Sequence, residues 1–392
     1  MQGSLYLAWR YLRHHWIKST ILVASITLII FLPLGVRVLI QQSARHLTAR
    51  AEATPLLVGM RGSPLELVLN SLYFGTGSPE ALPYSDVDAL DSMGLALPIP
   101  LYTRFRAQGY PIVGTSLDYF AFRDLTVSRG GMFAMLGECV LGTRVAEQMG
   151  LGPGDAVISS PESVFDIAGV YPLKMRVAGV LAFSDSPDDD AIFVDLKTAW
   201  VIGGFGHGHQ DLAEASAASG VLRRDSTSIT ANAAVVQYNE IMPDNIASFH
   251  FHGDVGSFPV TAIIAVPPDQ RSSTILRGRF EESSGAAQIV VPSDVMDELL
   301  GTVLTVQTFV LAAVVVLGMG TLATAGLVFG LSLRVRQREL MTMTKIGASP
   351  ASIRWLVVSE MVVVSAAGVA LAFLLTALTA SFGPPVIRAV FL

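Results

Sequence analysis

Charged side chains are scarce in this sequence. Only 15% of its 392 residues are Asp, Glu, Lys or Arg, whereas a typical soluble domain has about 25%. This shortage indicates membrane segments. The net charge is −6 and only 4 of the 26 basic residues are Lys, so no basic nucleic-acid surface is expected. A single cysteine, Cys139, excludes an intrachain disulfide and any multi-cysteine metal site.

Motifs for independent catalysis are also missing. The sequence has no Gly-Lys dipeptide, which excludes a phosphate-binding loop of the G-x-x-x-x-G-K-[ST] type. It has neither a G-x-S-x-G nucleophile elbow nor an H-E-x-x-H zinc motif. We therefore predict that the chain is not an enzyme and that any ATP it depends on is hydrolysed by another polypeptide.

Three charge-free runs predict three membrane spans, since a helix needs about 20 mainly apolar residues to cross the hydrocarbon layer and that layer solvates charge poorly. The runs lie between Lys18 and Arg37, between Glu298 and Arg334, and between Glu360 and Arg388. They predict transmembrane helices over 19–41, 301–333 and 353–381.

The first run has an alternative reading as a cleavable signal peptide. The run is longer than a usual signal core, and Gln41-Gln42-Ser43 is a poor cleavage site. An uncleaved anchor is therefore favoured.

The positions of Arg and Lys beside the spans predict the orientation. Residues 1–18 contain Arg10, Arg13 and Lys18, and the short segment 334–352 contains four more basic residues. Both segments are expected in the cytoplasm, the first as an amphipathic N-terminus. Residues 42–300 and the tail 382–392 are then extracytoplasmic.

The region 42–300 has the features of a folded domain. Strands are predicted at Tyr110–Gly114, Met175–Phe183, Ala191–Asp195, Thr261–Val266 and Gln288–Val291. Helices are predicted at Ser85–Ser92 and Thr143–Met149, with a further one capped by Ser293 that leads into the second span. The predicted fold is an integral membrane α-helical protein with three transmembrane helices and a large α+β extracytoplasmic domain between helices 1 and 2. Residues 203–255 are expected to form an insertion in that domain.

The segment 334–352 is the most specific part of the sequence. Leu340, Met343 and Ile346 recur every three residues, and Gly347 and Pro350 end the helical turn. Such a short amphipathic helix can bind the groove of a cytoplasmic partner. The alternative is an interfacial helix that lies on the lipid.

The pattern Arg336-x-Arg338-Glu339-Leu340, followed by Lys345-Ile346-Gly347-Ala348-Ser349, resembles the segment after the second transmembrane helix of FtsX/MacB-type ABC transporter permeases. Val140–Asp155 and Met175–Leu181 are similar to the strand, helix and Gly-Asp turn of the outer core domain in that family. Family members usually have a fourth transmembrane helix, whereas only 382–392 follow the third span here.

The resemblance implies a partner chain, a cytoplasmic ABC ATPase that holds ATP and magnesium, and two copies each of permease and ATPase in a bacterial inner membrane. In the family this segment is the coupling helix that contacts the ATPase. The implied coupling residues here are Arg336, Arg338, Glu339, Leu340, Met343, Lys345, Ile346, Gly347 and Ala348.

The leading functional hypothesis is a permease that transmits ATP-driven movement to its extracytoplasmic domain, for export or extraction of a substrate. Alternatives are an FtsX-like transducer that regulates an outer enzyme, Lol-like lipoprotein extraction, and an ABC system that handles a divalent metal. A periplasmic binding or adaptor protein is a further candidate partner, besides membrane lipid.

Two His-x-His pairs, His207-x-His209 and His250-x-His252, lie in the extracytoplasmic region. Residues two apart in a strand point to the same face, so each pair can offer two imidazoles to one ion, and zinc is the candidate cofactor. Asp211 and Asp254, each two residues beyond a pair, and Asp188-Asp189-Asp190 add carboxylates. The alternative is a polar loop and a surface strand with incidental histidines.

Two features of the spans carry weaker hypotheses. Gly326-x-x-x-Gly330 matches a helix-packing pattern, although glycine is common in membrane helices. Glu360 lies near the start of the third span and is interpreted as an interfacial residue rather than part of a proton relay.

Overall fold

The structure is a computed structural model. It describes residue 6, residues 9–10, 12–160, 172–209, 221–224, 229–231, 238–283 and 285–391. The chain divides into two compact units. We call Arg50–Met296 the sheet unit, and Met1–Ala49 together with Asp297–Leu392 the helical unit. Each is described by itself.

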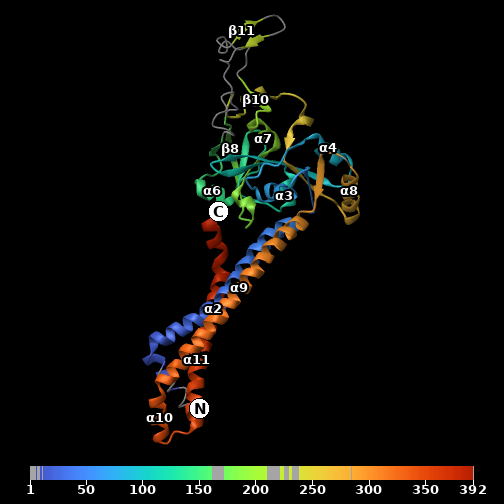
Figure 1. Cartoon of the computed structure of the whole chain (residues 1–392). Helices are drawn as coiled ribbons and strands as arrows, with labels where there is room; N and C mark the ends of the chain where they lie inside the picture. The colour runs from blue at the N-terminus through green and yellow to red at the C-terminus, as the bar shows by residue number, and fades with distance from the viewer. Residues whose placement is uncertain are drawn as a thin grey trace. The chain divides into compact units, whose positions relative to one another are not determined.

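A mixed ten-stranded sheet forms the centre of the sheet unit (Figure 1). Its strands follow the order β16-β1-β15-β3-β4-β9-β6-β8-β5, with β7 paired to β8. The pairs β4–β9 and β6–β8 are parallel and the others are antiparallel. The strands are β1 (Leu56–Met60), β3 (Leu97–Ala107), β4 (Tyr110–Thr115), β5 (Val127–Gly130), β6 (Glu138–Leu141), β7 (Ala156–Ile158), β8 (Lys174–Leu181), β9 (Ile192–Asp195), β15 (Ala262–Val266) and β16 (Ala287–Val290).

Short helices and smaller sheets complete this unit. Helix α7 packs on β3, β4 and β9, and α8 packs on β16. The helices are α3 (Pro64–Tyr73), α4 (Ser85–Ser92), α5 (Asp118–Phe122), α6 (Thr143–Met149), α7 (Leu196–Ile202) and α8 (Gln270–Glu282), with 3-10 turns η1 (Pro187–Asp190), η3 (Ile246–Ser248) and η4 (Val255–Ser257). The two-stranded sheets pair β2 (Leu82–Pro83) with β14 (Pro259–Val260), β10 (Gly206–Gly208) with β13 (Phe249–Phe251), and β11 (Val221–Arg224) with β12 (Ile229–Ala231).

The core of the sheet unit is apolar and closely packed. Strand β9 is buried at Ile192, Phe193 and Val194, and Cys139 on the neighbouring β6 is fully buried. Burial raises the pKa of the Cys139 thiol to about 12, as expected for a cysteine packed in the core.

The local patterns predicted most of these elements. Each of the five predicted strands overlaps an observed one, namely β4, β8, β9, β15 and β16, and the two predicted helices are α4 and α6 with the same bounds. The predicted cap at Ser293 is wrong, because the helix already begins at Pro292. A proline fits the first turn of a helix, where its missing N–H has no acceptor.

Three long helices and one short helix make up most of the helical unit. They are α2 (Trp16–Glu52), α9 (Pro292–Val335), α10 (Gln337–Lys345) and α11 (Pro350–Phe391). The last three residues of α2 and the first five of α9 belong to the sheet unit. Part of the predicted N-terminus, residues 1–5, 7, 8 and 11, lies outside the described residues.

Within the part of the chain that the structure describes, two helices are long and apolar enough to cross a membrane, at Trp16–Gln41 and Pro350–Ser381. They overlap the predicted spans 19–41 and 353–381. The predicted span 301–333 lies within α9, where Thr308–Thr324 is a shorter apolar stretch; its place in the membrane stays a prediction. Helix α11 continues to Phe391, so the predicted tail 382–392 is helical up to that residue.

The three long helices contact one another through small residues. The Thr27 hydroxyl of α2 donates to the Gly368 carbonyl of α11 at 3.1 Å. A Cβ at Gly368 would lie 2.7 Å from Ile26 Cγ2, and one at Gly318 of α9 would lie 3.0 Å from Ile29 Cγ2. Glycine therefore lets these helices approach closely, as small residues do in membrane bundles.

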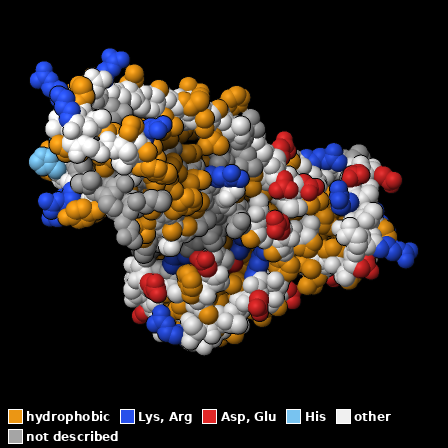
Figure 2. Space-filling model, turned by 90° about the horizontal axis from the view of Figure 1, so that it is seen from below, with side chains coloured by type: hydrophobic (Ala, Val, Ile, Leu, Met, Phe, Trp, Pro, Cys, Tyr) orange, Lys and Arg blue, Asp and Glu red, His pale blue; other side chains and the backbone are white. Residues whose placement is uncertain are grey.

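Large apolar side chains are exposed on all three long helices. Examples are Ile21 on α2, Leu317 on α9 and Phe373 on α11. Figure 2 shows a broad hydrophobic area in which no acidic side chain appears among the described residues. Water would penalise such a surface, whereas lipid would not.

Candidate functional site

Helix α10 is a short helix between α9 and α11 (Figure 1). Gly347 ends it with a φ of +98°. The Gly347 N–H donates to the Thr344 carbonyl at 3.1 Å and the Ala348 N–H to the Met343 carbonyl at 3.0 Å, which is a Schellman motif. Ser349 then caps α11, because its hydroxyl accepts the Ser352 N–H at 3.2 Å. The turn after α10 is therefore well defined.

Arg336 joins the start of α10 to α11. It is buried, and its Nη1 lies 3.1 Å and 3.0 Å from the two carboxylate oxygens of Glu360, which is also buried. Glu360 is thus the partner of an arginine 24 residues earlier. The predicted coupling residue Arg336 contacts the chain's own helix, so its contribution to coupling would be internal.

The other predicted coupling residues lie mostly at the surface. Arg338, Lys345 and Ile346 are exposed, and Met343 and Ala348 are half-buried. The side chains of Glu339 and Leu340 lie outside the described residues. Met341, which the three-residue spacing did not single out, is exposed as well. The exposed residues among them lie on α10 and its C-terminal turn.

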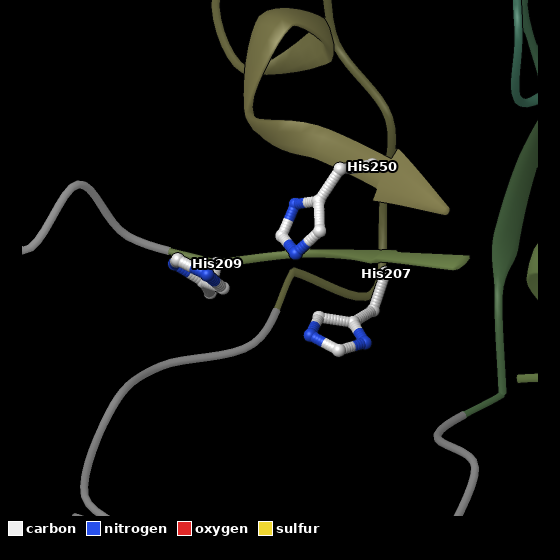
Figure 3. A group of neighbouring side chains, drawn as sticks. All are labelled: His207, His209 and His250. Carbon is white, nitrogen blue, oxygen red and sulfur yellow. The ribbon is translucent and has the colours of Figure 1, made fainter. Parts of the chain in front are cut away.

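The two His-x-His pairs meet in the sheet unit. Strands β10 and β13 are antiparallel, with His207 directly opposite His250. One ring nitrogen each from His207, His209 and His250 lies within 4.8 Å of the other two, and Figure 3 shows the His250 ring reaching toward β10. The His252 ring centroid is 4.7 Å from those of both His207 and His250. Burial and the neighbouring imidazoles lower the pKa of His207, which favours its neutral, ligand-competent form.

The carboxylates expected near the histidines serve other partners. Asp254 accepts the Gly256 N–H at 3.1 Å in its own turn, and Asp190 pairs with Arg144 at 2.6 Å. Asp211 lies outside the described residues. Among the described residues, the group suited to a metal consists of imidazoles.

Sequence reasoning missed a buried constellation around Arg50. Its Nη1 and Nη2 lie 2.6 Å and 2.8 Å from the two carboxylate oxygens of Asp188, and Nη2 also donates to the Tyr119 hydroxyl at 2.7 Å. The Tyr119 hydroxyl donates to Asp188 at 2.6 Å. Burial opposes ionisation of Asp188, but Arg50 outweighs it and the pKa of Asp188 is lowered. No local pattern could reveal a pair 138 residues apart.

Comparison with known families decides the class of the protein. The model of the MacB-like periplasmic core domain matches residues 20–238, more than half of the chain. The chain belongs to the MacB/FtsX-type permease family. It is therefore a permease of the ABC-transporter type, a membrane protein with an extracytoplasmic domain, and the sheet unit is that domain. Subunits of this family are generally non-catalytic, and the family implies an ATPase partner in the cytoplasm.

Two solved structures similar to this MacB/FtsX-type chain are extracytoplasmic regions of transporters. The periplasmic region of MacB from Actinobacillus actinomycetemcomitans is 12% identical over 67% of this chain and 97% of its own, with a TM-score of 0.36. The extracellular domain of the ABC-type transporter YknZ from Gram-positive bacteria is 12% identical over 60% and 98%, with a TM-score of 0.32. No curated protein sequence matches the chain. The family assignment rests on the family model alone.

Proposed function

We propose that a separate cytoplasmic ABC ATPase binds α10 and its C-terminal turn, and that ATP-driven movement of this segment changes the shape of the extracytoplasmic domain. The observation that carries the proposal is the combination of an exposed α10 with a buried tie, Arg336–Glu360, at its start. The N-terminus and α10 would then lie in the cytoplasm of a bacterium, and the membrane would be the inner one.

The exposed surface of α10 suits a protein groove. Ile346 is 80% exposed and Met341 is 55% exposed, and the cations Arg338 and Lys345 lie on the same short segment. Apolar anchors that bury in a groove supply most of the affinity of a helix-in-groove complex, while charges at the rim orient it. The rigid Schellman turn would present Ile346 with little loss of conformational freedom on binding.

The Arg336–Glu360 pair supports transmission from α10 to α11. Breaking a buried ion pair leaves an unpaired charge and costs about 3–5 kcal/mol. A displacement of α10 would therefore move α11 rather than separate the two residues. Because α11 contacts α2 through Thr27 and Gly368, the displacement would also reach α2.

The links from the helices to the sheet are short. Three residues, 53–55, separate α2 from β1, and Val291 alone separates β16 from α9. Strands β1 and β16 are themselves paired, from Leu57 opposite Val290 to Met60 opposite Ala287. Because these connections are so short, movement of α2 relative to α9 would displace this strand pair, which lies at one edge of the sheet.

A second copy of the chain is part of the proposal. Gly326 and Gly330 lie on an exposed face of α9, and a Cβ at either would meet nothing within 4 Å. This open pair of glycines would admit a helix of another permease subunit. Export, lipoprotein extraction and control of an outer enzyme would all use the same change of shape, and an outer binding or adaptor protein would distinguish them.

Reconstitution in nanodiscs with the cognate ABC ATPase tests the proposal. Ile346→Glu should weaken ATPase binding at least tenfold, which corresponds to about 1.4 kcal/mol. Ile158→Glu is the matched control, since Ile158 is 56% exposed on β7 of the sheet unit and should leave binding unchanged. Equal binding by wild type and Ile346→Glu would contradict the docking site.

The role of the Arg336–Glu360 ion pair is tested separately from ATPase binding. Arg336→Ala should keep ATPase binding but reduce permease-dependent ATP hydrolysis at least about tenfold. The exchange Arg336→Glu with Glu360→Arg should restore part of the rate, because it restores the pair. Full activity in Arg336→Ala would show that coupling follows another path.

A further inference from the structure

The strongest unassigned feature is the histidine cluster on β10 and β13, and it does not depend on the proposed coupling. We propose that His207, His209 and His250 bind one Zn²⁺ ion that joins these two strands on the extracytoplasmic domain. His252 is a fourth imidazole, beside His207 and His250. Zinc prefers nitrogen and sulfur ligands in tetrahedral sites, and the chain offers imidazoles here without thiolates.

The strand register brings the four rings to one face. His207 and His250 are directly opposite each other, with ring centroids 5.0 Å apart. His209 lies 5.2 Å from His250 on one side, and His252 lies 4.7 Å from His207 on the other. The central pair is therefore common to both possible triads. Nitrogen ligands at about 2.0–2.1 Å from a tetrahedral zinc lie about 3.3 Å from one another. The ring nitrogens, which lie within 4.8 Å of one another, would therefore have to approach by up to about 1.5 Å.

The opposite face of the strand pair is held by aromatic packing. Phe251 lies against Trp200 and Phe258, with centroids 6.5 Å and 6.0 Å apart. A Cβ at Gly206 would lie 2.7 Å from the Phe251 ring, and one at Gly208 would lie 2.5 Å from the Phe249 ring. In the Gly-His-Gly-His sequence, the two glycines therefore lie against the rings of Phe251 and Phe249. The two histidines lie on the other face of the strand.

One ring is already oriented for a ligand role. The Nδ1 atom of His250 lies 2.9 Å from the Ser248 carbonyl oxygen. A hydrogen bond from Nδ1 to a carbonyl sets the tautomer and leaves Nε2 to bind a metal, which is the usual arrangement around metal-bound histidines.

A metal at this position would have a clear structural effect. A two-stranded pair is marginally stable by itself, and β10 and β13 have three residues each. The chain between them contains residues 209–248. A metal that bridges the strands would hold the two ends of this segment together, and joining the ends of a long chain segment removes conformational entropy from the metal-free state.

Zinc titration of the full-length protein in nanodiscs tests the proposal. The protein is purified without a polyhistidine tag, stripped with EDTA, and titrated against a chromophoric zinc chelator. We expect one Zn²⁺ per chain with a dissociation constant below about 10 µM, and slower amide exchange in β10 and β13 when zinc is bound. Weaker binding, or binding that leaves this exchange unchanged, would overturn the proposal.

Two double variants show where the zinc ion binds. The double change His207→Gln and His250→Gln should weaken zinc binding at least about 100-fold. Loss of a residue that only hydrogen-bonds to a metal ligand already costs about 10–100-fold in metal affinity. His14→Gln with His15→Gln changes two adjacent histidines of the helical unit and should leave the affinity unchanged. Single changes to Gln at His209 and at His252 should each keep the fold. The change at His209 should reduce the affinity for zinc more than the change at His252.

Cobalt gives an independent readout on the unaltered chain. Co²⁺ in place of Zn²⁺ should show the visible absorption of a tetrahedral site with nitrogen ligands, and Zn²⁺ should displace it. An octahedral spectrum, or equal affinity in the His207–His250 double variant, would assign the ion to another place and contradict the proposal.

Discussion

The sheet unit and the helical unit both bury an arginine–carboxylate pair, yet the surroundings of the two pairs differ. Arg50 and Asp188 are enclosed by a core that also supplies the Tyr119 hydroxyl. Arg336 and Glu360 lie between α10 and α11, helices whose apolar side chains are largely exposed. The same chemistry therefore stabilises a packed fold in one unit and connects two helices in the other.

The comparison also separates two uses of apolar residues. In the sheet unit they are removed from water by each other, so their packing determines stability. In the helical unit many of them, such as Leu317 and Phe373, face outward, and lipid is as apolar as they are. Changes to matched residues in the two units should therefore differ in size.

The largest expected effect is at Arg50. Arg50→Ala leaves the buried Asp188 carboxylate without its arginine partner, and should lower the free energy of unfolding of the sheet unit by about 3–5 kcal/mol. Lys174→Ala is the control, because its pair with Glu240 at 2.8 Å has side chains 41% and 32% exposed and should contribute less than about 1 kcal/mol. Amide exchange of β9 and η1 in the full chain measures both. Equal losses would refute the distinction between buried and exposed pairs.

The next effect compares two leucines. Leu101 on β3 is fully buried, whereas Leu317 on α9 is 71% exposed. Leu101→Ala should cost about 2–5 kcal/mol through the cavity it leaves, and Leu317→Ala should cost less than about 0.5 kcal/mol. Thermal unfolding in nanodiscs gives the two values. A large loss at Leu317 would indicate that this face of α9 packs against protein.

A smaller effect is expected where α2 meets α11. Gly368→Ala places a Cβ 2.7 Å from Ile26 Cγ2 and 2.9 Å from Ile26 Cβ, so the helices must shift at a cost of about 1–3 kcal/mol. Gly320→Ala on α9 meets nothing within 4 Å and should be neutral. Unfolding by SDS in mixed micelles compares the two variants. Similar midpoints for both would show that the close approach of α2 and α11 does not contribute to stability.

The smallest effect is the response to pH near neutrality. The pKa of Asp188 is lower in the folded chain than its usual value, so its contribution to stability is complete above an unfolded pKa of about 3.9 and is lost only as pH falls below it. Between about pH 5 and pH 8 the exchange protection of η1 should not change through Asp188. A loss of protection in that range that Asp188→Asn removes would contradict the lowered pKa.

Local patterns predicted much of the fold. Strands such as β4 and β9 and helices such as α4 and α6 were evident from the spacing of their apolar residues. The bounds of the long helices were less evident. The predicted end of the first span, residue 41, agrees with the apolar stretch Trp16–Gln41. Hydropathy did not show that α2 itself continues to Glu52, because a polar or charged residue ends an apolar run without ending a helix.

The candidate sites were predicted as pieces. The segment at α10 was visible because its helix and turn are contiguous in the sequence. The histidine pairs were visible too, but their meeting was not, since His207 and His250 come together only through the register of β10 and β13. The role of Glu360 as the partner of Arg336 was also missed, because the two residues meet only when α11 packs beside the start of α10.

The sequence by itself determined where apolar helices form, which segment projects from them, and which family the chain resembles, because these depend on residues close together along the chain. The tertiary structure alone decided which charges are buried and paired. Arg50 and Asp188 are 138 residues apart, and their pairing depends on the position of η1 after the sheet has formed. Burial and partnership are properties of the packed chain, so no local spacing encodes them.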